Sequence, residues 1–138
     1  MRQCEGCEVC CTVCEVPELS KPSDKRCGHC NGGCAIYAER PPSCRSFDCY
    51  WLTSELSDSL RPDKCGVMFE KLTETILLAY ASSVWDSPEI VETIQSFLNE
   101  GKAVVLKAGD ARHVFVSDGR TAEGVWNEVL QVATVRGI

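Results

Sequence analysis

The sequence predicts an α+β protein in which a loop-rich cysteine lobe precedes a small antiparallel sheet with one or two helices. Ten of the eleven cysteines in the 138-residue chain fall between Cys4 and Cys49, which we call the cysteine-rich segment. Prolines and glycines interrupt the same segment, and it has little hydrophobic periodicity. Beyond residue 65 there is no further cysteine, and apolar residues recur with the spacing of strands and helices.

The cysteine-rich segment has too few apolar residues to bury much hydrophobic surface. Ordering it costs about 1–2 kcal/mol per residue in backbone entropy, which another interaction must offset. The chain opens Met1-Arg2-Gln3-Cys4, without the apolar run of a secretory signal, so we expect a cytoplasmic protein in which disulfides are rare. Bound metal is then the expected stabiliser, since a structural zinc contributes on the order of 10–16 kcal/mol in small peptides.

The first cysteines have the spacing of metal ligands. Cys4-x-x-Cys7 and Cys7-x-x-Cys10 each have knuckle spacing, which lets two thiolates converge on one ion. Cys10 and Cys11 are adjacent, and neighbouring side chains diverge in helices and strands. These two cysteines are therefore expected to serve different metals, unless one thiolate bridges a polynuclear cluster.

A second motif runs from Cys34 to Trp51 and reads Cys-x-Ile-Tyr-x-x-Arg-Pro-x-x-Cys-Arg-x-Phe-x-Cys-x-Trp. Downstream of Cys-x-x-Cys-x-x-Cys-Cys, it resembles the bacterial cysteine-cluster family of zinc- or iron-chelating proteins (YkgJ-like, CxxCxxCC). The resemblance covers about residues 4–51 and implies metal chelation by eight cysteines, the number that two tetrahedral sites require. The implied metal ligands are Cys4, Cys7, Cys10, Cys11, Cys27, Cys34, Cys44 and Cys49.

Three cysteines stay outside this set: Cys14, Cys30 and Cys65. For each of them the expectation is a free buried cysteine. A related segment occurs in bacterial flagellin lysine methylases, so the resemblance also implies a link to methyl transfer.

Two alternatives to a zinc site remain open. The spacing from Cys4 to Cys14 matches a bacterial ferredoxin cluster loop, although Glu15 stands where that loop has proline, so iron or an iron–sulfur cluster is the alternative cofactor. Cys27-Gly28-His29-Cys30 has the C-x-x-C spacing of thiol–disulfide exchange. That chemistry needs the first cysteine at a helix N-terminus after a strand, and the flanking residues do not have that pattern.

The second motif also contains arginines and aromatic residues. We expect the guanidinium groups of Arg40 and Arg45 to offset the negative charge of a tetrathiolate zinc centre. The aromatic residues are expected to form a small core beside the metals. They are Tyr37, Phe47, Tyr50 and Trp51.

The composition changes near residues 52–64, which divides the chain into a cysteine-rich metal-binding lobe, 1–60, and an α+β lobe, 61–138. Residues 67–70 and 75–80 are expected to be strands, although a helix over 66–82 also fits the apolar pattern. Ser87-Pro88-Glu89 predicts a helix start with Ser87 as N-cap, and Gly101 predicts its end.

The C-terminal part of the second lobe is expected to form a hairpin and a closing helix. Residues 102–107 and 112–116 are β-rich, with a loop between them. Residues 121–130 are expected to form the helix, with Trp126 packing inward.

The net charge of the chain indicates which classes of binding partner to expect. The net charge is −6, and both halves are acidic, with 8 basic and 10 acidic residues in 1–65 and 6 and 10 in 66–138. We therefore expect no nucleic-acid partner and no association with an anionic membrane. No apolar run approaches the roughly 18–20 residues of a membrane-spanning helix.

The sequence contains no phosphate-binding glycine loop, no G-x-S-x-G and no H-E-x-x-H motif, so whether the protein is an enzyme stays open. We expect a cytoplasmic metal-binding protein with two cysteine-rich sites and zinc as cofactor. Its expected partners are metal ions and, for a recognition role, another protein. The alternative functions are an iron–sulfur redox or protein-modification enzyme component, and thiol–disulfide exchange at Cys27 and Cys30.

Overall fold

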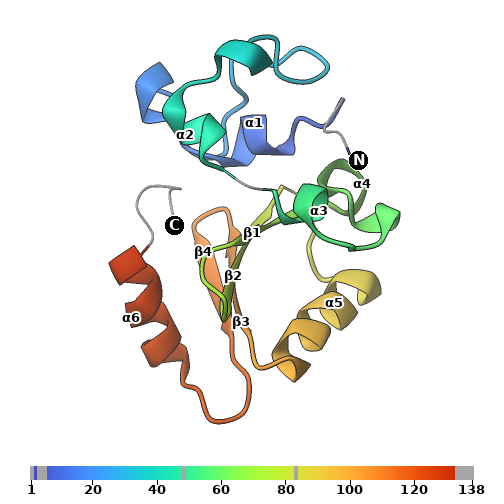
Figure 1. The fold of residues 1–138 in the computed structure, drawn as a ribbon, viewed down its shortest axis with the longest axis vertical. Coiled ribbons are helices and arrows are strands. Elements are labelled where there is room, and N and C mark those ends of the chain that lie inside the picture. The colour runs from blue at the N-terminus through green and yellow to red at the C-terminus, as the bar shows by residue number, and fades with distance from the viewer. Residues whose placement is uncertain (1, 3–5, 48, 83, 133–138) are drawn as a thin grey trace.

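The computed structural model describes residues 2, 6–47, 49–82 and 84–132 (Figure 1). Its helices are α1 (Val9–Val13), α2 (Pro42–Arg45), α3 (Tyr50–Thr53), α4 (Pro62–Cys65), α5 (Pro88–Asn99) and α6 (Ala122–Val132). Short 3-10 helices are η1 (Pro17–Leu19), η2 (Tyr37–Glu39) and η3 (Asp58–Leu60). The strands are β1 (Val67–Lys71), β2 (Ile76–Ala81), β3 (Ala103–Ala108) and β4 (Ala111–Phe115).

The four strands form one sheet in the order β1-β2-β3-β4. The α+β class is confirmed, but the expectation of a purely antiparallel sheet is corrected. β1 with β2 and β3 with β4 are antiparallel, whereas β2 and β3 run parallel, with Leu78 opposite Val105. The reason is α5, which lies between β2 and β3 in the chain and provides the long crossover that parallel neighbours need.

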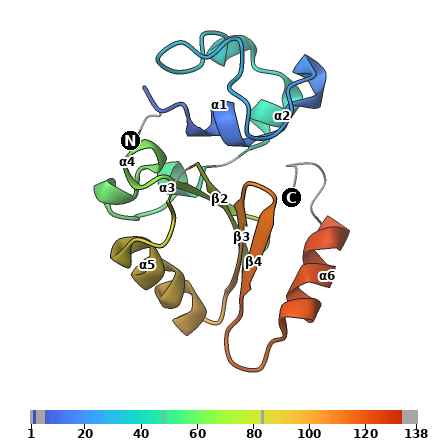
Figure 2. The same ribbon diagram turned by 180° about the vertical axis from the view of Figure 1, so that it is seen from behind.

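Helices cover both faces of the sheet. α5 and α3 pack on one face through Ile94, Phe97 and Trp51. α6 and α1 pack on the other face, where Val129 and Val13 contact its buried residues. Figures 1 and 2 show α5 and α6 on opposite sides of the strands. Because both faces are covered, every residue of β2 is buried, which is why its sequence is apolar without alternation.

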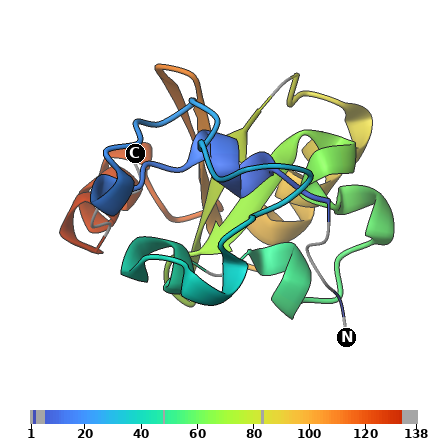
Figure 3. The same ribbon diagram turned by 90° about the horizontal axis from the view of Figure 1, so that it is seen from above.

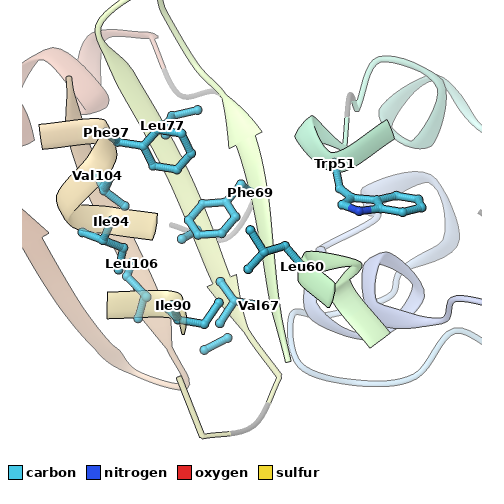
Figure 4. Packing of buried hydrophobic residues seen from close by; sticks show 12 residues of the cluster. Trp51, Leu60, Val67, Phe69, Leu77, Ile90, Ile94, Phe97, Val104 and Leu106 are labelled. Carbon is cyan, nitrogen blue, oxygen red and sulfur yellow. The ribbon is translucent and has the colours of Figure 1, made fainter. Parts of the chain in front are cut away.

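The α5 helix follows its predicted local signals. The Ser87 hydroxyl accepts a hydrogen bond from the Ile90 amide at 3.4 Å, and Pro88 occupies the first helical position. Gly101 has a φ of 83°, the left-handed conformation that ends many helices. The Phe97 ring packs edge-on against Phe69 with centroids 5.5 Å apart (Figure 4), so this helix is fixed to β1 as well as to β3.

The described part of the cysteine-rich segment lies across one end of the sheet (Figure 1) and in front of it in Figure 3. Its helix α1 packs into the core through Val9 and Val13. Trp51, from the predicted first lobe, belongs to the core on the opposite face. The hydrophobic core therefore crosses the boundary expected at residues 60 and 61.

Candidate metal centre

A cavity of about 110 Å³ lies between the cysteine-rich segment and the sheet. Met68 of β1 and Leu52 of α3 form part of its wall, together with Ile36 and Phe47 from the segment itself. Eight cysteines contribute to the rest of the lining. The cysteines that line it are Cys7, Cys10, Cys11, Cys14, Cys27, Cys34, Cys44 and Cys49.

The cavity brings together the predicted metal ligands that the structure describes. Seven of the eight line it, and the eighth, Cys4, lies outside the described residues. Cys14 lines the cavity too, although the family pattern left it out. Within the described part of the chain, Cys30 and Cys65 are not on the cavity wall. The ferredoxin-like spacing from Cys4 to Cys14 was the one sequence signal that included Cys14.

Three elements position these thiols. Helix α1 carries Cys10 and Cys11 and ends at Cys14, whose amide donates to the Cys10 carbonyl. The Cys27 amide donates to the Cys11 carbonyl at 2.8 Å, which holds the following loop against α1. Cys49 forms an antiparallel bridge with Glu70 of β1, which fixes the end of the segment to the sheet edge.

Cys10 and Cys11 both reach the cavity, and their side chains are hydrogen-bonded to each other. Successive residues of a helix differ by about 100° in direction, and here that turn leaves both sulfurs on the wall. Both interpretations of the pair, separate metals or a bridging thiolate, are compatible with this placement. The hydrogen bond with Cys10, followed by burial, raises the pKa of the Cys11 thiol well above its ordinary value.

Burial also raises the pKa of the Cys7 and Cys44 thiols. These sulfurs are protonated at neutral pH in the metal-free protein, so they are weak nucleophiles there. Burial likewise raises the pKa of Cys30 to about 11, and residues 28 and 29 form a turn rather than the start of a helix. The helix N-terminus that thiol–disulfide exchange needs at the first cysteine is therefore not formed at Cys27.

The donor set suits a thiophilic metal, because thiolates bind both zinc and iron. Within residues 6–47, 49–82 and 84–132, however, no three His, Cys, Asp or Glu side chains gather closely enough to hold an ion. A zinc–sulfur bond is about 2.3 Å long, so ion binding requires the sulfurs on the wall to move inward.

The two arginines expected beside the sulfurs lie differently from each other. Arg40 lines the cavity, but its guanidinium stacks on the Tyr37 ring at 3.8 Å and its Nε donates to the Tyr37 carbonyl. Arg45 ends α2 and is not among the described residues on the cavity wall.

The aromatic residues do not form the single core expected beside the metals. Tyr37 is 50% exposed. Phe47 packs edge-on against Tyr80, and Tyr50 packs against Phe97 on the opposite face of the sheet. Trp51 is buried with the core of α5. Only Tyr37 and Phe47 of the four line the cavity.

Comparison with known proteins finds no relative: no family model, no curated protein and no solved structure matches the chain. The resemblance to the cysteine-cluster family therefore rests on the two cysteine motifs. None of the helices in the described residues has both the length and the apolar character to cross a membrane.

Proposed function

We propose that this chain is a cytoplasmic metal-binding protein whose cysteine-lined cavity holds zinc. The observation that supports the proposal is the convergence of eight cysteines, distributed from Cys7 to Cys49, on one cavity. Scattered structural cysteines would be expected in several apolar sites, as Cys65 is, with its thiol near the carbonyls of Leu60 and Val67. A shared cavity is instead the arrangement that a thiolate-bound metal requires.

The single cavity favours a polynuclear centre over two separate sites. Cys10 and Cys11 line the same cavity, so of the two interpretations of this pair we propose the bridging thiolate. One water molecule needs a cavity volume of about 10–15 Å³. The cavity, at about 110 Å³, has room for more than one ion. All the ligands in this proposal are thiolates, which are typical of closed structural zinc sites that stabilise a fold.

The residues have clear roles in this proposal. The cavity cysteines hold the metal, and zinc supplies the free energy that the loop-rich segment cannot obtain from apolar burial. The role we propose is therefore to shape the cysteine-rich segment for structural, chelating or protein-recognition purposes.

An iron–sulfur cluster is the second candidate, and one observation favours it. Cys7, Cys10 and Cys14 all line the cavity, and they are the last three positions of the ferredoxin-like spacing. Redox or protein-modification chemistry would follow from that cofactor rather than from zinc.

Thiol footprinting tests the proposed ligand set. Protein loaded with zinc is alkylated, digested and analysed by mass spectrometry, and the experiment is repeated after chelation. We expect zinc to protect the eight cavity cysteines and to leave the alkylation of Cys65, a matched half-buried thiol, unchanged. Equal alkylation of the cavity cysteines with and without zinc would overturn the proposal.

A further inference from the structure

Lys21 is a buried cation next to the cysteine-lined cavity. Only 7% of the residue is exposed. Its ammonium donates to the carbonyls of Thr12 and Pro22, each at 3.0 Å, and to the carbonyl of Cys14. In the part of the chain that the structure describes, this ammonium forms no ion pair with a carboxylate. Burying an ammonium is costly unless negative charge lies nearby.

The backbone holds Lys21 in place at some conformational cost. Two hydrogen bonds join its backbone to Val16, at 2.9 and 3.1 Å. Ser20 and Asp24, which flank it, have φ values of 50° and 59° and are the two non-glycine residues with positive φ among those described. Such conformations cost on the order of 1–3 kcal/mol each and cluster at functional sites. The Lys21 backbone is therefore held between two residues in the left-handed conformation and by its bridge to Val16.

Besides the three carbonyls that accept its hydrogen bonds, the Lys21 ammonium has cavity thiols in its surroundings. The sulfurs close enough to interact with its charge are those of Cys14, Cys27 and Cys11, all of which line the cavity. The nearby carboxylate, Asp24, is paired with a second buried lysine, Lys107. Asp24 is thus paired with Lys107, and the Lys21 ammonium forms no ion pair with it among the described residues.

We propose that Lys21 is the countercharge of the thiolate centre and a positioning residue for it. This inference rests on the proposed function. Four neutral thiols that bind one Zn²⁺ release four protons, so the site changes from zero to −2 in charge. A fixed ammonium beside Cys11, Cys14 and Cys27 stabilises that product, as guanidinium groups were expected to do at Arg40 and Arg45. Its bonds to the Thr12 and Cys14 carbonyls also fix the end of α1, which carries cavity cysteines.

Cobalt titration of three variants tests this role. Co²⁺ is the probe, because its thiolate complexes absorb in the visible range, and affinity is measured by competition with a chelator. We expect Lys21→Met and Lys21→Gln to weaken Co²⁺ binding about 10–100-fold, the usual effect of losing a group outside the ligand shell. Lys21→Arg, which keeps the charge, is expected to stay close to the wild type.

The outcomes distinguish an effect of the Lys21 charge from an effect of its hydrogen bonds on the local structure. Gln retains hydrogen-bond donors without charge, so a Lys21→Gln variant with wild-type affinity would overturn the countercharge role in favour of carbonyl capping. If Lys21→Met fails to fold, the comparison of Lys21→Gln with Lys21→Arg still decides. Tight and equal Co²⁺ binding by all variants would overturn this inference alone. A wild-type protein that binds no Co²⁺ would instead overturn the proposed function.

Discussion

Lys107 of β3 forms an ion pair with Asp24 of the cysteine-rich segment, across 83 positions of sequence. The lysine side chain is 4% exposed and the aspartate side chain 42% exposed. The central sheet and the turn that carries Lys21 are therefore joined by an ion pair whose ammonium is buried and whose carboxylate is partly exposed to solvent.

This asymmetry predicts unequal effects of the two neutral substitutions. Asp24→Asn leaves the Lys107 ammonium buried without its partner, so we expect it to lower the free energy of unfolding by about 3 kcal/mol. Asn tolerates the left-handed backbone at this position, which isolates the charge effect. Lys107→Met leaves a partly hydrated carboxylate and is expected to cost less. Urea denaturation of both variants measures the difference, and an equal or smaller loss for Asp24→Asn would contradict the account.

Cys14 and Cys30 distinguish the cavity from the family pattern. Both are buried and neither belongs to the implied ligand set, but only Cys14 lines the cavity. We expect Cys14→Ser to lose bound metal, because a serine oxygen is a poorer ligand for a thiophilic ion. Cys30→Ser is the matched control and is expected to retain the wild-type metal content in elemental analysis. Loss of metal from Cys30→Ser with retention in Cys14→Ser would contradict the assignment of the metal ligands to the cavity.

Cys44 and Cys65 provide a second matched pair. Cys44→Ser is expected to disorder the cysteine-rich segment, because the metal supplies its stability. Proteolysis and near-ultraviolet circular dichroism measure this loss. Cys65→Ser is expected to keep both metal and fold, since its sulfur is hydrogen-bonded to backbone groups of Leu60 and Val67 and is not among the described residues on the cavity wall. A soluble Cys44→Ser variant with full metal content and an unchanged thermal unfolding temperature would contradict this prediction.

Val13 tests whether the metal centre and the sheet unfold together. It is 1% exposed on α1 and packs into the core shared with α6. Val13→Ala removes two methyl groups from that core, so we expect it to destabilise the protein by about 2 kcal/mol. Tryptophan fluorescence and zinc release should follow one urea transition, shifted equally by the substitution. Zinc release well before the fluorescence change would show that lobes 1–60 and 61–138 unfold independently.

The elements that the sequence predicts well are those with local signals. Ser87, Pro88 and Gly101 mark α5 because capping and left-handed termination depend on neighbouring residues. The apolar runs that became β2 and β3 were also recognisable, because a strand buried on both faces must be apolar. Their parallel direction was not, since an apolar run carries no information on which neighbour it pairs with.

The candidate site shows the same division. The family resemblance implied the seven described ligands that line the cavity, whereas short spacing by itself indicated only Cys7 and Cys10 among them. The family pattern left Cys14 out, and only the ferredoxin-like spacing grouped it with Cys7 and Cys10. That Cys14 faces the same cavity depends on the orientation of α1 against the sheet. Lys21 had no local signal at all, because a lysine is exposed by default and becomes buried only through the tertiary fold.

Elemental analysis of protein purified without oxygen, with a visible spectrum of the same sample, tests the central claim most directly. The account predicts zinc bound in about two equivalents per chain, in one thiolate-bridged centre, and no colour. Iron with acid-labile sulfide and a brown chromophore would replace zinc by the iron–sulfur alternative. A folded, metal-free protein whose cavity thiols all react freely would contradict metal binding in this cavity.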